Sequence, residues 1–345
     1  MSRARSYLWF FAKRLGTVVF ALWSLGSLVF LMIKVIPGDE AQIAAGPDAS
    51  PDQVALVRQR LGLDASVIVQ YFRFWGRLLH GDLGTSITTF QPVLLDLERT
   101  LPSTLELVVV AMLINLSVSI PAGLIAAARR GGRTDGLFRV LAVILGGMPA
   151  FWLALMLQYL LAARYRLLPI SGQNSYGMEP PRWTGVPTLD AIAAGNMASL
   201  LDALTYIVLP AAVLAVLYST QIFRALRTSL LGVLESDFIM AVRAKGATER
   251  RVLIGHAFPN SINPVLTLAG TQLGAMIGAA VLVETVFARR GIGTYMFNAV
   301  AQKDMYAVLG SVLFIGAIVC LINLVVDVLQ IVVDPRIRAA QFGRS

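Results

Sequence analysis

Six long stretches without a charged residue limit what this chain can fold into. Each runs for at least 18 residues with no Asp, Glu, Lys or Arg, and neither histidine interrupts any of them. They are residues 16–33, 107–128, 140–163, 203–223, 257–283 and 305–326. A membrane-spanning helix needs about 20 mostly apolar residues, and the backbone finds no water in the bilayer, so each stretch is expected to be helical. The sequence therefore predicts an all-α polytopic membrane protein with six transmembrane helices.

The composition agrees with the bilayer as the solvent. Hydrophobic residues make up 57% of the 345 residues and charged residues only 14%, against about 25% charged in soluble domains. A buried core helix would explain one such stretch but is a poor explanation for six. The single cysteine, Cys320, excludes an internal disulfide. With His80 and His256 it does not reach the four ligands that a Cys/His zinc site needs.

The distribution of charge predicts the orientation. With the N-terminus in the cytoplasm, the inner segments 1–15, 129–139, 224–256 and 327–345 hold 17 of the 29 basic residues and 6 of the 20 acidic ones. Short cytoplasmic loops carry an excess of Lys and Arg, so both termini are expected in the cytoplasm. The net charge of +9 then reflects topology rather than binding of nucleic acid. The first stretch resembles a signal peptide, but its apolar run is longer than usual, and we expect an uncleaved anchor.

The outer segment 36–100 contains two predicted helices. Ser50-Pro51 followed by Gln53 has the pattern of a helix start with a capping box, and Gly62 can end that helix. The second helix is predicted from four apolar residues at helical spacing. These are Val67, Tyr71, Phe74 and Leu78. Both helices are expected on the membrane surface or over the helix bundle, where they would form either a docking surface for an extracellular partner or a structural lid.

The inner segment between the fourth and fifth stretches predicts a helix–turn–helix that projects into the cytoplasm. Ser236 can cap a short helix that runs to Lys245, and Gly246 can end it with a positive φ. Thr248 can cap the next helix, which we expect to end at Pro259. The segment is too small for a DNA-reading core. A rigid protrusion suits the transmission of force from a soluble partner, and an ordinary structured loop is the alternative.

Missing motifs argue against several kinds of chemistry. A phosphate-binding loop of the Walker type needs Gly-Lys followed by Ser or Thr, and none of the four lysines follows a glycine. If transport is driven by ATP, the ATPase is therefore another polypeptide, and no cofactor is expected on this chain. No Gly-x-Ser-x-Gly motif is present. The stretches hold no paired carboxylates, whereas a proton-coupled carrier usually has ionisable residues at mid-membrane depth.

The helix–turn–helix also carries a resemblance to a known family. Its residues resemble the EAA loop of permeases from ABC importers, in which a proline lies thirteen positions after a glycine, as Pro259 does after Gly246. The matching stretches are Arg243-Ala244-Lys245-Gly246-Ala247, Arg250-Arg251-Val252-Leu253 and Phe258-Pro259-Asn260. Met240-Ala241-Val242 stands in place of Glu-Ala-Ala. The peptide/nickel branch of the family also lacks this glutamate, so the departure fits that branch.

Further stretches resemble the B-type permease of dipeptide and oligopeptide importers, and together they span nearly the whole chain. They are residues 36–39, 81–86, 101–107, 149–152, 284–287 and 334–338. Ala288-Arg289-Arg290 departs from the apolar-proline turn that is usual there. The resemblance implies the type I ABC-importer permease fold and a place in the bacterial cytoplasmic (inner) membrane. It divides the chain into an anchor with an outer segment, residues 1–106, and a five-helix permease core, residues 107–345.

The resemblance also implies a function and partners. The chain would be the permease subunit of an ATP-driven importer of dipeptides or oligopeptides and would form half of a heterodimeric pore in the lipid bilayer. The partners would be a C-type sister permease, two ATPase subunits that bind ATP and Mg, and an extracytoplasmic peptide-binding protein. Nickel, glutathione or opines remain possible substrates within the family. A stand-alone channel or secondary carrier, and an intramembrane enzyme, are the alternatives from other classes.

The coupling of ATP hydrolysis to transport is expected at the helix–turn–helix. The residues predicted to contact the ATPases are Met240, Ala241, Arg243, Ala244, Lys245, Gly246, Ala247, Arg250 and Arg251. Positive-inside topology alone is the alternative explanation for the basic residues among them.

The fifth stretch has a repeat of small residues. Gly270, Gly274 and Gly278 recur every four positions, and such stripes let membrane helices approach closely. We expect this stripe to pack against another helix of the bundle or of the sister permease. Gln272 faces nearly the opposite side, so Gln272 and Thr271 are candidates to line the substrate path. Alternatively, the glycines are ordinary membrane-helix residues and Gln272 is a buried hydrogen-bonding residue.

Overall fold

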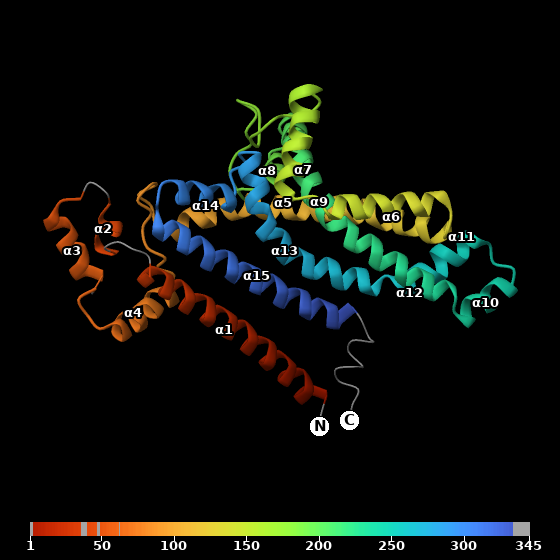
Figure 1. Cartoon of the computed structure of the whole chain (residues 1–345), viewed down its shortest axis with the longest axis horizontal. Coiled ribbons are helices and arrows are strands. Elements are labelled where there is room, and N and C mark those ends of the chain that lie inside the picture. The colour runs from red at the N-terminus through yellow and green to blue at the C-terminus, as the bar shows by residue number, and fades with distance from the viewer. Residues whose placement is uncertain (1–2, 36–39, 47–48, 62, 334–345) are drawn as a thin grey trace. The chain divides into compact units, whose positions relative to one another are not determined.

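The computed structural model describes residues 3–35, 40–46, 49–61 and 63–333, and most of these residues are helical (Figure 1). Over this part of the chain no β-strand is formed, and Thr85 and Pro92 make an isolated antiparallel bridge. The predicted helix end at Gly62 and the family-like stretches 36–39 and 334–338 lie outside the described residues. The all-helical prediction is confirmed.

The chain folds into two compact units. The first contains residues 1–104 and 290–324, and the second contains residues 105–289 and 325–345. The helices α5 (Val93–Ala128) and α15 (Met305–Val333) each contribute residues to both units.

The first unit contains α1. Its other helices are α2 (Glu40–Ala45), α3 (Pro51–Leu61), α4 (Val67–Leu79), α14 (Ile292–Ala301) and the first parts of α5 and α15. Helix α1 (Arg3–Val35) packs against α4, where the Tyr71 hydroxyl lies 2.7 Å from the Ser27 hydroxyl. Gly26 allows this approach, because a Cβ there would come within 2.8 Å of the Trp75 ring.

Both predicted helices of the outer segment are present. The capping box of α3 forms as the sequence predicts: Ser50 N donates to Gln53 Oε1 at 2.8 Å, and Gln53 N donates to Ser50 Oγ at 3.4 Å. Helix α4 places Tyr71, Phe74 and Leu78 on its packed face. The apolar spacing therefore predicted the packed face of α4 for three of its four residues, whereas Val67 is 57% exposed.

The second unit holds the remaining helices. They are α6 (Arg133–Gly146), α7 (Ala150–Leu157), the π-helix η1 (Gln158–Arg164), α8 (Pro187–Ala193), α9 (Met197–Leu234), α10 (Asp237–Ala244), α11 (Glu249–Arg251), the π-helix η2 (Val252–Ala257), α12 (Phe258–Ser261) and α13 (Asn263–Val286). Helix α9 lies at the centre of this unit and packs against α6, α7, α8 and α13.

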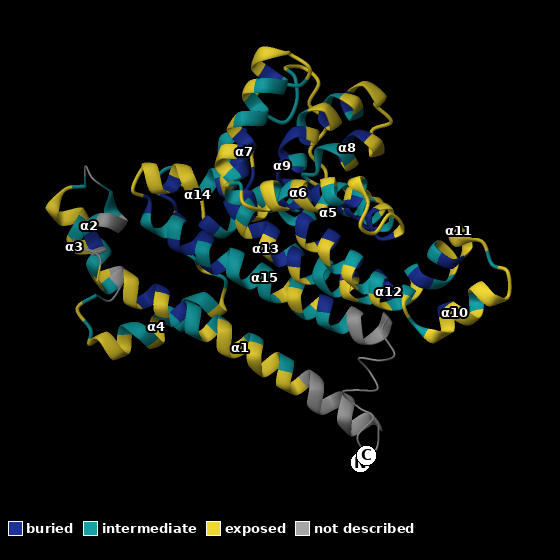
Figure 2. Cartoon of the chain, turned by 45° about the vertical axis from the view of Figure 1, so that its right-hand side comes forward, coloured by how far each residue is buried: buried dark blue, intermediate teal, exposed yellow. Residues whose placement is uncertain are grey.

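Five helices in the described residues are long and apolar enough to cross a bilayer. Their apolar windows lie in Ala12–Met32, Val93–Ala128, Met197–Leu234, Asn263–Val286 and Met305–Val328. Exposed positions run along α1 in Figure 2, and they include Val19, Phe20 and Leu31. Exposed apolar side chains on a helix of this length fit contact with lipid rather than with water.

The predicted span over residues 140–163 is not one continuous helix. The segment forms two helices, Arg133–Gly146 and Ala150–Arg164, which are bent by 106° where they meet. Gly146 and Gly147 end the first helix, and Pro149 precedes the second with an extended backbone at ψ 139. Proline has no N–H to continue a helix and disfavours helical geometry in the residue before it. The described residues thus contain five candidate spans, or six if the bent pair counts as one.

Two details of the inner segment also differ from prediction. The Ser236 side chain does not cap α10; its hydroxyl donates to the Val233 carbonyl at 2.6 Å. Pro259 does not end the second helix, because helical structure continues through η2 and α12 to Ser261. Pro259 lies in the first turn of α12, directly after the π-helix, where its missing N–H is tolerated.

Candidate functional site

The inner segment forms a rigid protrusion from the second unit. Its helical arm α10 buries Ile239 completely, and its arm η2 buries Val252 and Ala257 completely. All three belong to an apolar cluster with residues of α5, α9 and α13. These further members are Ala127, Ile222, Leu226, Leu230 and Val265. The protrusion is thereby packed against three of the apolar helices. Ile239 and Val252 were not predicted as its anchors, although both are apolar residues within a polar stretch of the sequence.

The turn between the two arms depends on Gly246. Its φ is +79°, a value that residues with a Cβ rarely adopt. A Cβ at this position would meet no atom within 4 Å, so the requirement for glycine is conformational and not steric. Thr248 Oγ1 accepts a hydrogen bond of 3.4 Å from Arg251 N. The predicted positive φ at Gly246 and cap at Thr248 are confirmed.

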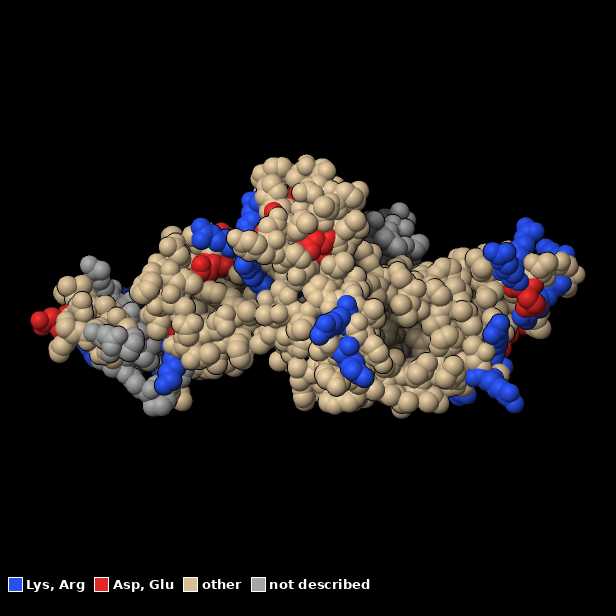
Figure 3. All heavy atoms as spheres, turned by 90° about the horizontal axis from the view of Figure 1, so that it is seen from above, with Lys and Arg blue, Asp and Glu red and all other residues tan. Residues whose placement is uncertain are grey.

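The predicted ATPase-contact residues share an accessible position. Among Met240, Ala241, Arg243, Ala244, Lys245, Gly246, Ala247, Arg250 and Arg251, only Ala247 is half-buried and the others are exposed. Phe238 and Met240 add exposed apolar area on α10. Figure 3 shows basic atoms gathered at the right-hand end of the molecule, where Figure 1 draws α10 and α11. The surface is therefore basic with an apolar patch, and Phe238 extends the set that the sequence analysis identified.

One ion pair links α10 to α11 in the protrusion. Arg243 Nε and Nη2 donate to the two carboxylate oxygens of Glu249 at 2.8 and 3.0 Å. This hydrogen-bonded pair lowers the pKa of Glu249 and raises that of Arg243. Both residues are exposed, so the pair orients Arg243 more than it stabilises the fold.

A second ion pair joins the C-terminal part of α9 to α6. Arg227 Nε and Nη2 donate to the two carboxylate oxygens of Asp135, both at 2.7 Å. Asp135 is buried in the first turn of α6, where a carboxylate also interacts favourably with the helix dipole. This pair was not predicted, because nothing in the sequence relates two residues 92 positions apart.

The centre of α13 contains a buried hydrogen-bonded amide cluster. Asn115 Nδ2 of α5 donates to Gln272 Oε1 at 3.0 Å. Gln272 Nε2 donates to two acceptors on α9, the Tyr218 carbonyl at 3.1 Å and Gln221 Oε1 at 3.2 Å. Gln272 is 3% exposed. Gln272 therefore connects three helices of the second unit, which favours the interpretation as a buried hydrogen-bonding residue in this conformation.

The glycine stripe of α13 is not uniform. Gly274 is buried, Gly270 is half-buried, and Gly278 is exposed with open space around it. Thr271 is exposed, and its hydroxyl donates to the Leu268 carbonyl of its own helix at 2.9 Å. An exposed Gly278 leaves room for another helix. The packing role of the stripe and the substrate-path role of Thr271 and Gln272 stay predictions.

The opposite end of α13 leads to a buried group of charges. Arg289 is 1% exposed and forms an ion pair with Glu106 of α5. Thr188 of α8 donates to the same carboxylate from its backbone N at 2.9 Å and from its hydroxyl at 2.6 Å. Glu284 is also buried and acts electrostatically on Arg289. Burial lowers the pKa of Arg289, while the two carboxylates oppose this shift.

Comparison with known proteins identifies the family. Residues 119–339 match the binding-protein-dependent transport system inner membrane component, and residues 7–108 match the N-terminal part of such membrane components. The chain belongs to this family. The resemblance to an ABC-importer peptide permease of the B-type is thus confirmed, and the chain is a transport component.

Several relatives in this family match almost end to end. The dipeptide transport system permease protein DppB of Escherichia coli K12 is 38% identical over 336 residues, which cover 96% of this chain and 99% of the relative. The probable D,D-dipeptide permease DdpB of the same strain is 38% identical over 311 residues, covering 90% and 92%. The di/tripeptide permease DppB of Pseudomonas aeruginosa UCBPP-PA14 is 37% identical over 334 residues, covering 95% and 98%.

A solved structure supports the fold. A chain from inward-facing MetNI, a methionine ABC transporter, superimposes with a TM-score of 0.51 at 16% identity. The match covers 69% of this chain and 96% of the solved one. At this identity the likeness concerns the permease fold alone.

Among the described residues, no three His, Cys, Asp or Glu side chains are grouped so as to hold a metal ion.

Proposed function

We propose that this chain is the B-type permease of an ATP-driven importer for dipeptides and short oligopeptides. The observation that carries the proposal is the 38% identity with a dipeptide permease over 96% of this chain and 99% of the relative. The chain would form half of a heterodimeric pore with a C-type sister permease.

The remaining parts of the importer would be separate chains. Two cytoplasmic ATPase subunits would bind ATP and Mg, and an extracytoplasmic peptide-binding protein would deliver the substrate. We infer a bacterial inner membrane location with both termini in the cytoplasm. The six-helix topology of the proposal counts the bent pair α6 and α7–η1 as one span. The division into residues 1–106 and 107–345, with the coupling loop 224–256, belongs to the same proposal.

The protrusion would couple ATP hydrolysis to transport. Closure of the ATPases would displace α10 through its exposed surface, which includes Phe238, Met240 and Arg243. The buried side chains of Ile239 and Val252 connect α10 and η2 to α9 and α13. Because close-packed interiors transmit displacement rather than absorb it, motion of α10 would move both spans.

Purification from the native membrane tests the proposal. The full-length chain carries an affinity tag, and the complex is extracted in mild detergent and identified by mass spectrometry. We expect one sister permease and two ATPase subunits per tagged chain. Proteoliposomes with the complex and its binding protein should accumulate labelled dipeptide only with ATP. Purification of the chain without an ATPase would overturn the importer, and ATP-dependent uptake of nickel or glutathione but not of dipeptide would overturn the substrate.

A further inference from the structure

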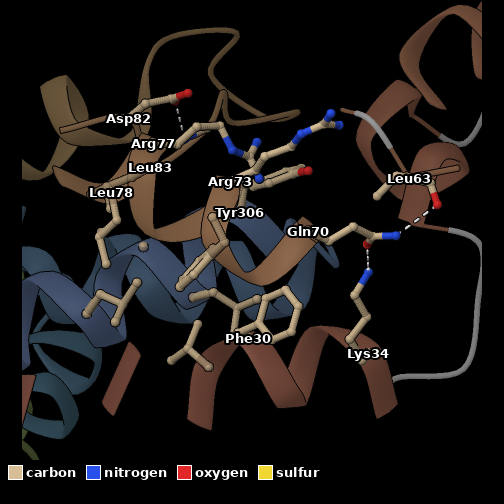
Figure 4. Close-up of a pocket in the computed structure, with 16 residues that line it drawn as sticks. Phe30, Lys34, Leu63, Gln70, Arg73, Arg77, Leu78, Asp82, Leu83 and Tyr306 are labelled. Carbon is tan, nitrogen blue, oxygen red and sulfur yellow. Dashed lines mark hydrogen bonds between the residues drawn. The ribbon is translucent and has the colours of Figure 1, made fainter. Parts of the chain in front are cut away.

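The first unit contains a groove between α1, α4 and α15. It has a volume of ≈ 750 Å³, including the space that is open to solvent. Sixteen residues line it, and most of them are apolar or aromatic (Figure 4). All belong to the same compact unit. Nothing in the transport cycle proposed above uses this groove.

The floor of the groove is apolar. Val29 and Phe30 of α1 and Leu309 and Leu313 of α15 form it, and all four side chains are buried at 8% exposure or less. Phe74 of α4 contacts this floor, with its ring 5.6 Å from that of Phe30. The floor is therefore built from the outer ends of two apolar spans together with the helix that lies across them.

The rim of the groove is basic. Arg73 and Arg77 are one turn apart on α4, and Figure 4 shows their guanidinium groups at the same side of the opening. Lys34 enters from the last turn of α1 and donates to Gln70 Oε1 of α4. Gln70 is fixed in turn by its Nε2, which donates to the Leu63 carbonyl at 2.9 Å and the Ala65 carbonyl at 2.8 Å. Three cations thus face one opening, with Asp82 as the acidic lining residue.

The surface beside the groove is suited to acyl chains. On α4, Ile68 and Phe72 are 70% and 68% exposed, and on α1, Leu31 and Val35 are 59% and 80% exposed. A helix with a basic edge and exposed apolar residues lies in the membrane interface, with its apolar face in the acyl region. The end of α1 brings Lys34 to the same depth, where long basic side chains reach toward headgroups.

We propose that this groove binds one anionic phospholipid. Its phosphate would accept hydrogen bonds from Arg73, Arg77 and Lys34, and one acyl chain would lie over Val29, Phe30 and Leu313. The guanidinium fork matches phosphate oxygens in a bidentate manner. A free phosphate would use the rim but leave the apolar floor exposed to water, so the combination of rim and floor favours a lipid.

Lipid titration of the full-length protein tests this site. The purified chain, with any subunits that accompany it, is placed in nanodiscs of phosphatidylcholine that contain increasing phosphatidylglycerol. Native mass spectrometry then counts the retained phosphatidylglycerol. The double variant Arg73→Gln with Arg77→Gln should bind phosphatidylglycerol about 30-fold more weakly, since each basic residue near the membrane surface contributes about 1 kcal/mol. Arg99→Gln, at an exposed arginine of α5 in the same unit, should change binding less than twofold.

Two measurements decide between the sources of the phosphate and exclude an effect on folding. The variant with Arg73→Lys and Arg77→Lys should retain binding to within about fivefold, because the charges remain. Inorganic phosphate should not displace the lipid from the wild-type protein. Displacement by inorganic phosphate would overturn the lipid assignment in favour of a simple anion site. Equal retention of phosphatidylcholine and phosphatidylglycerol by the wild type, or equal loss in the Arg99→Gln control, would overturn the site itself.

Discussion

Two Arg–Glu pairs in the second unit show how burial changes the role of the same residue types. Arg243 and Glu249 lie in the inner protrusion with side chains 40% and 73% exposed. Arg289 follows α13 and Glu106 lies within α5, and their side chains are 1% and 3% exposed. The pKa of Arg243 is raised by its hydrogen-bonded partner, whereas burial lowers the pKa of Arg289. The two arginines are therefore shifted in opposite directions.

The difference separates a pair that stabilises the fold from a pair that is accessible to a partner protein. An exposed pair is surrounded by water and contributes little to folding, so Arg243 and Glu249 remain available to a partner. A buried pair cannot lose one member without leaving a desolvated charge. Arg289 and Glu106, with Thr188, thus fix the connections after α13 and before α8, while the protrusion presents charges to the cytoplasmic side of the proposed topology.

The strongest test of the comparison is removal of the buried arginine. Arg289→Met leaves the carboxylates of Glu106 and Glu284 buried without their cation. We expect a loss of about 3–5 kcal/mol in the free energy of unfolding, measured by denaturant titration in detergent. Arg290→Met, at the exposed next residue, is the matched control and should change stability by about 0.5 kcal/mol or less. Similar losses in both variants would show that the loop, not the buried pair, determines stability.

A second test concerns a buried polar contact without formal charge. Gln272→Leu removes the acceptor of the Asn115 amide in the core of the second unit. We expect a loss of about 1–3 kcal/mol, the cost of an unsatisfied buried polar group. Thr271→Val at the adjacent exposed position is the control. If Gln272→Leu keeps wild-type stability but transports less peptide, the substrate-path prediction is favoured over the structural one.

The turn of the protrusion and the buried pairs differ in how far the sequence predicts them. Gly246 and Thr248 were predicted correctly because glycine at a positive φ and a threonine cap act on neighbouring residues. The pairs Glu106–Arg289 and Asn115–Gln272 join residues 183 and 157 positions apart, and no periodic pattern in one sequence relates such residues. Ala288-Arg289-Arg290 was recognised only as a departure from the family pattern.

The bend in the third apolar stretch was missed for another reason. A search for charge-free runs measures composition, and residues 140–163 satisfy it whether they form one helix or two. The signal for the break, Gly146-Gly147 followed by Pro149, is local and was present in the sequence. Weighing helix breakers within each run would have predicted the interruption, although not its angle.

A third test separates geometry from charge in the protrusion. Gly246→Val forces a β-branched residue to a φ of +79°, which costs about 1–2 kcal/mol for a residue with a Cβ. The turn should relax and displace α10, so that the variant inserts in the membrane but hydrolyses ATP without peptide uptake. Gly246→Asn is the control, because asparagine tolerates this conformation. Normal uptake by Gly246→Val would contradict a coupling role for the turn.

The smallest effect on stability is expected at the exposed pair. Reversing two charges with Arg243→Glu and Lys245→Glu breaks the contact with Glu249 but leaves no buried charge. We therefore expect a change of about 1 kcal/mol or less in the free energy of unfolding. The same variant should lose most of its ATPase subunits on affinity purification, because like charges across an interface are repulsive.

The control for this last variant removes the pair without reversing the surface charge. Glu249→Gln abolishes the carboxylate that orients Arg243 and keeps every basic residue of the protrusion. If Arg243 contacts the ATPase as an oriented side chain, Glu249→Gln should weaken co-purification only partly. If the basic residues serve topology alone, neither variant should change the amount of ATPase recovered. A charge reversal that leaves ATPase recovery intact but destabilises the fold would contradict the contrast between the two pairs, since the exposed pair would then act as the buried one does.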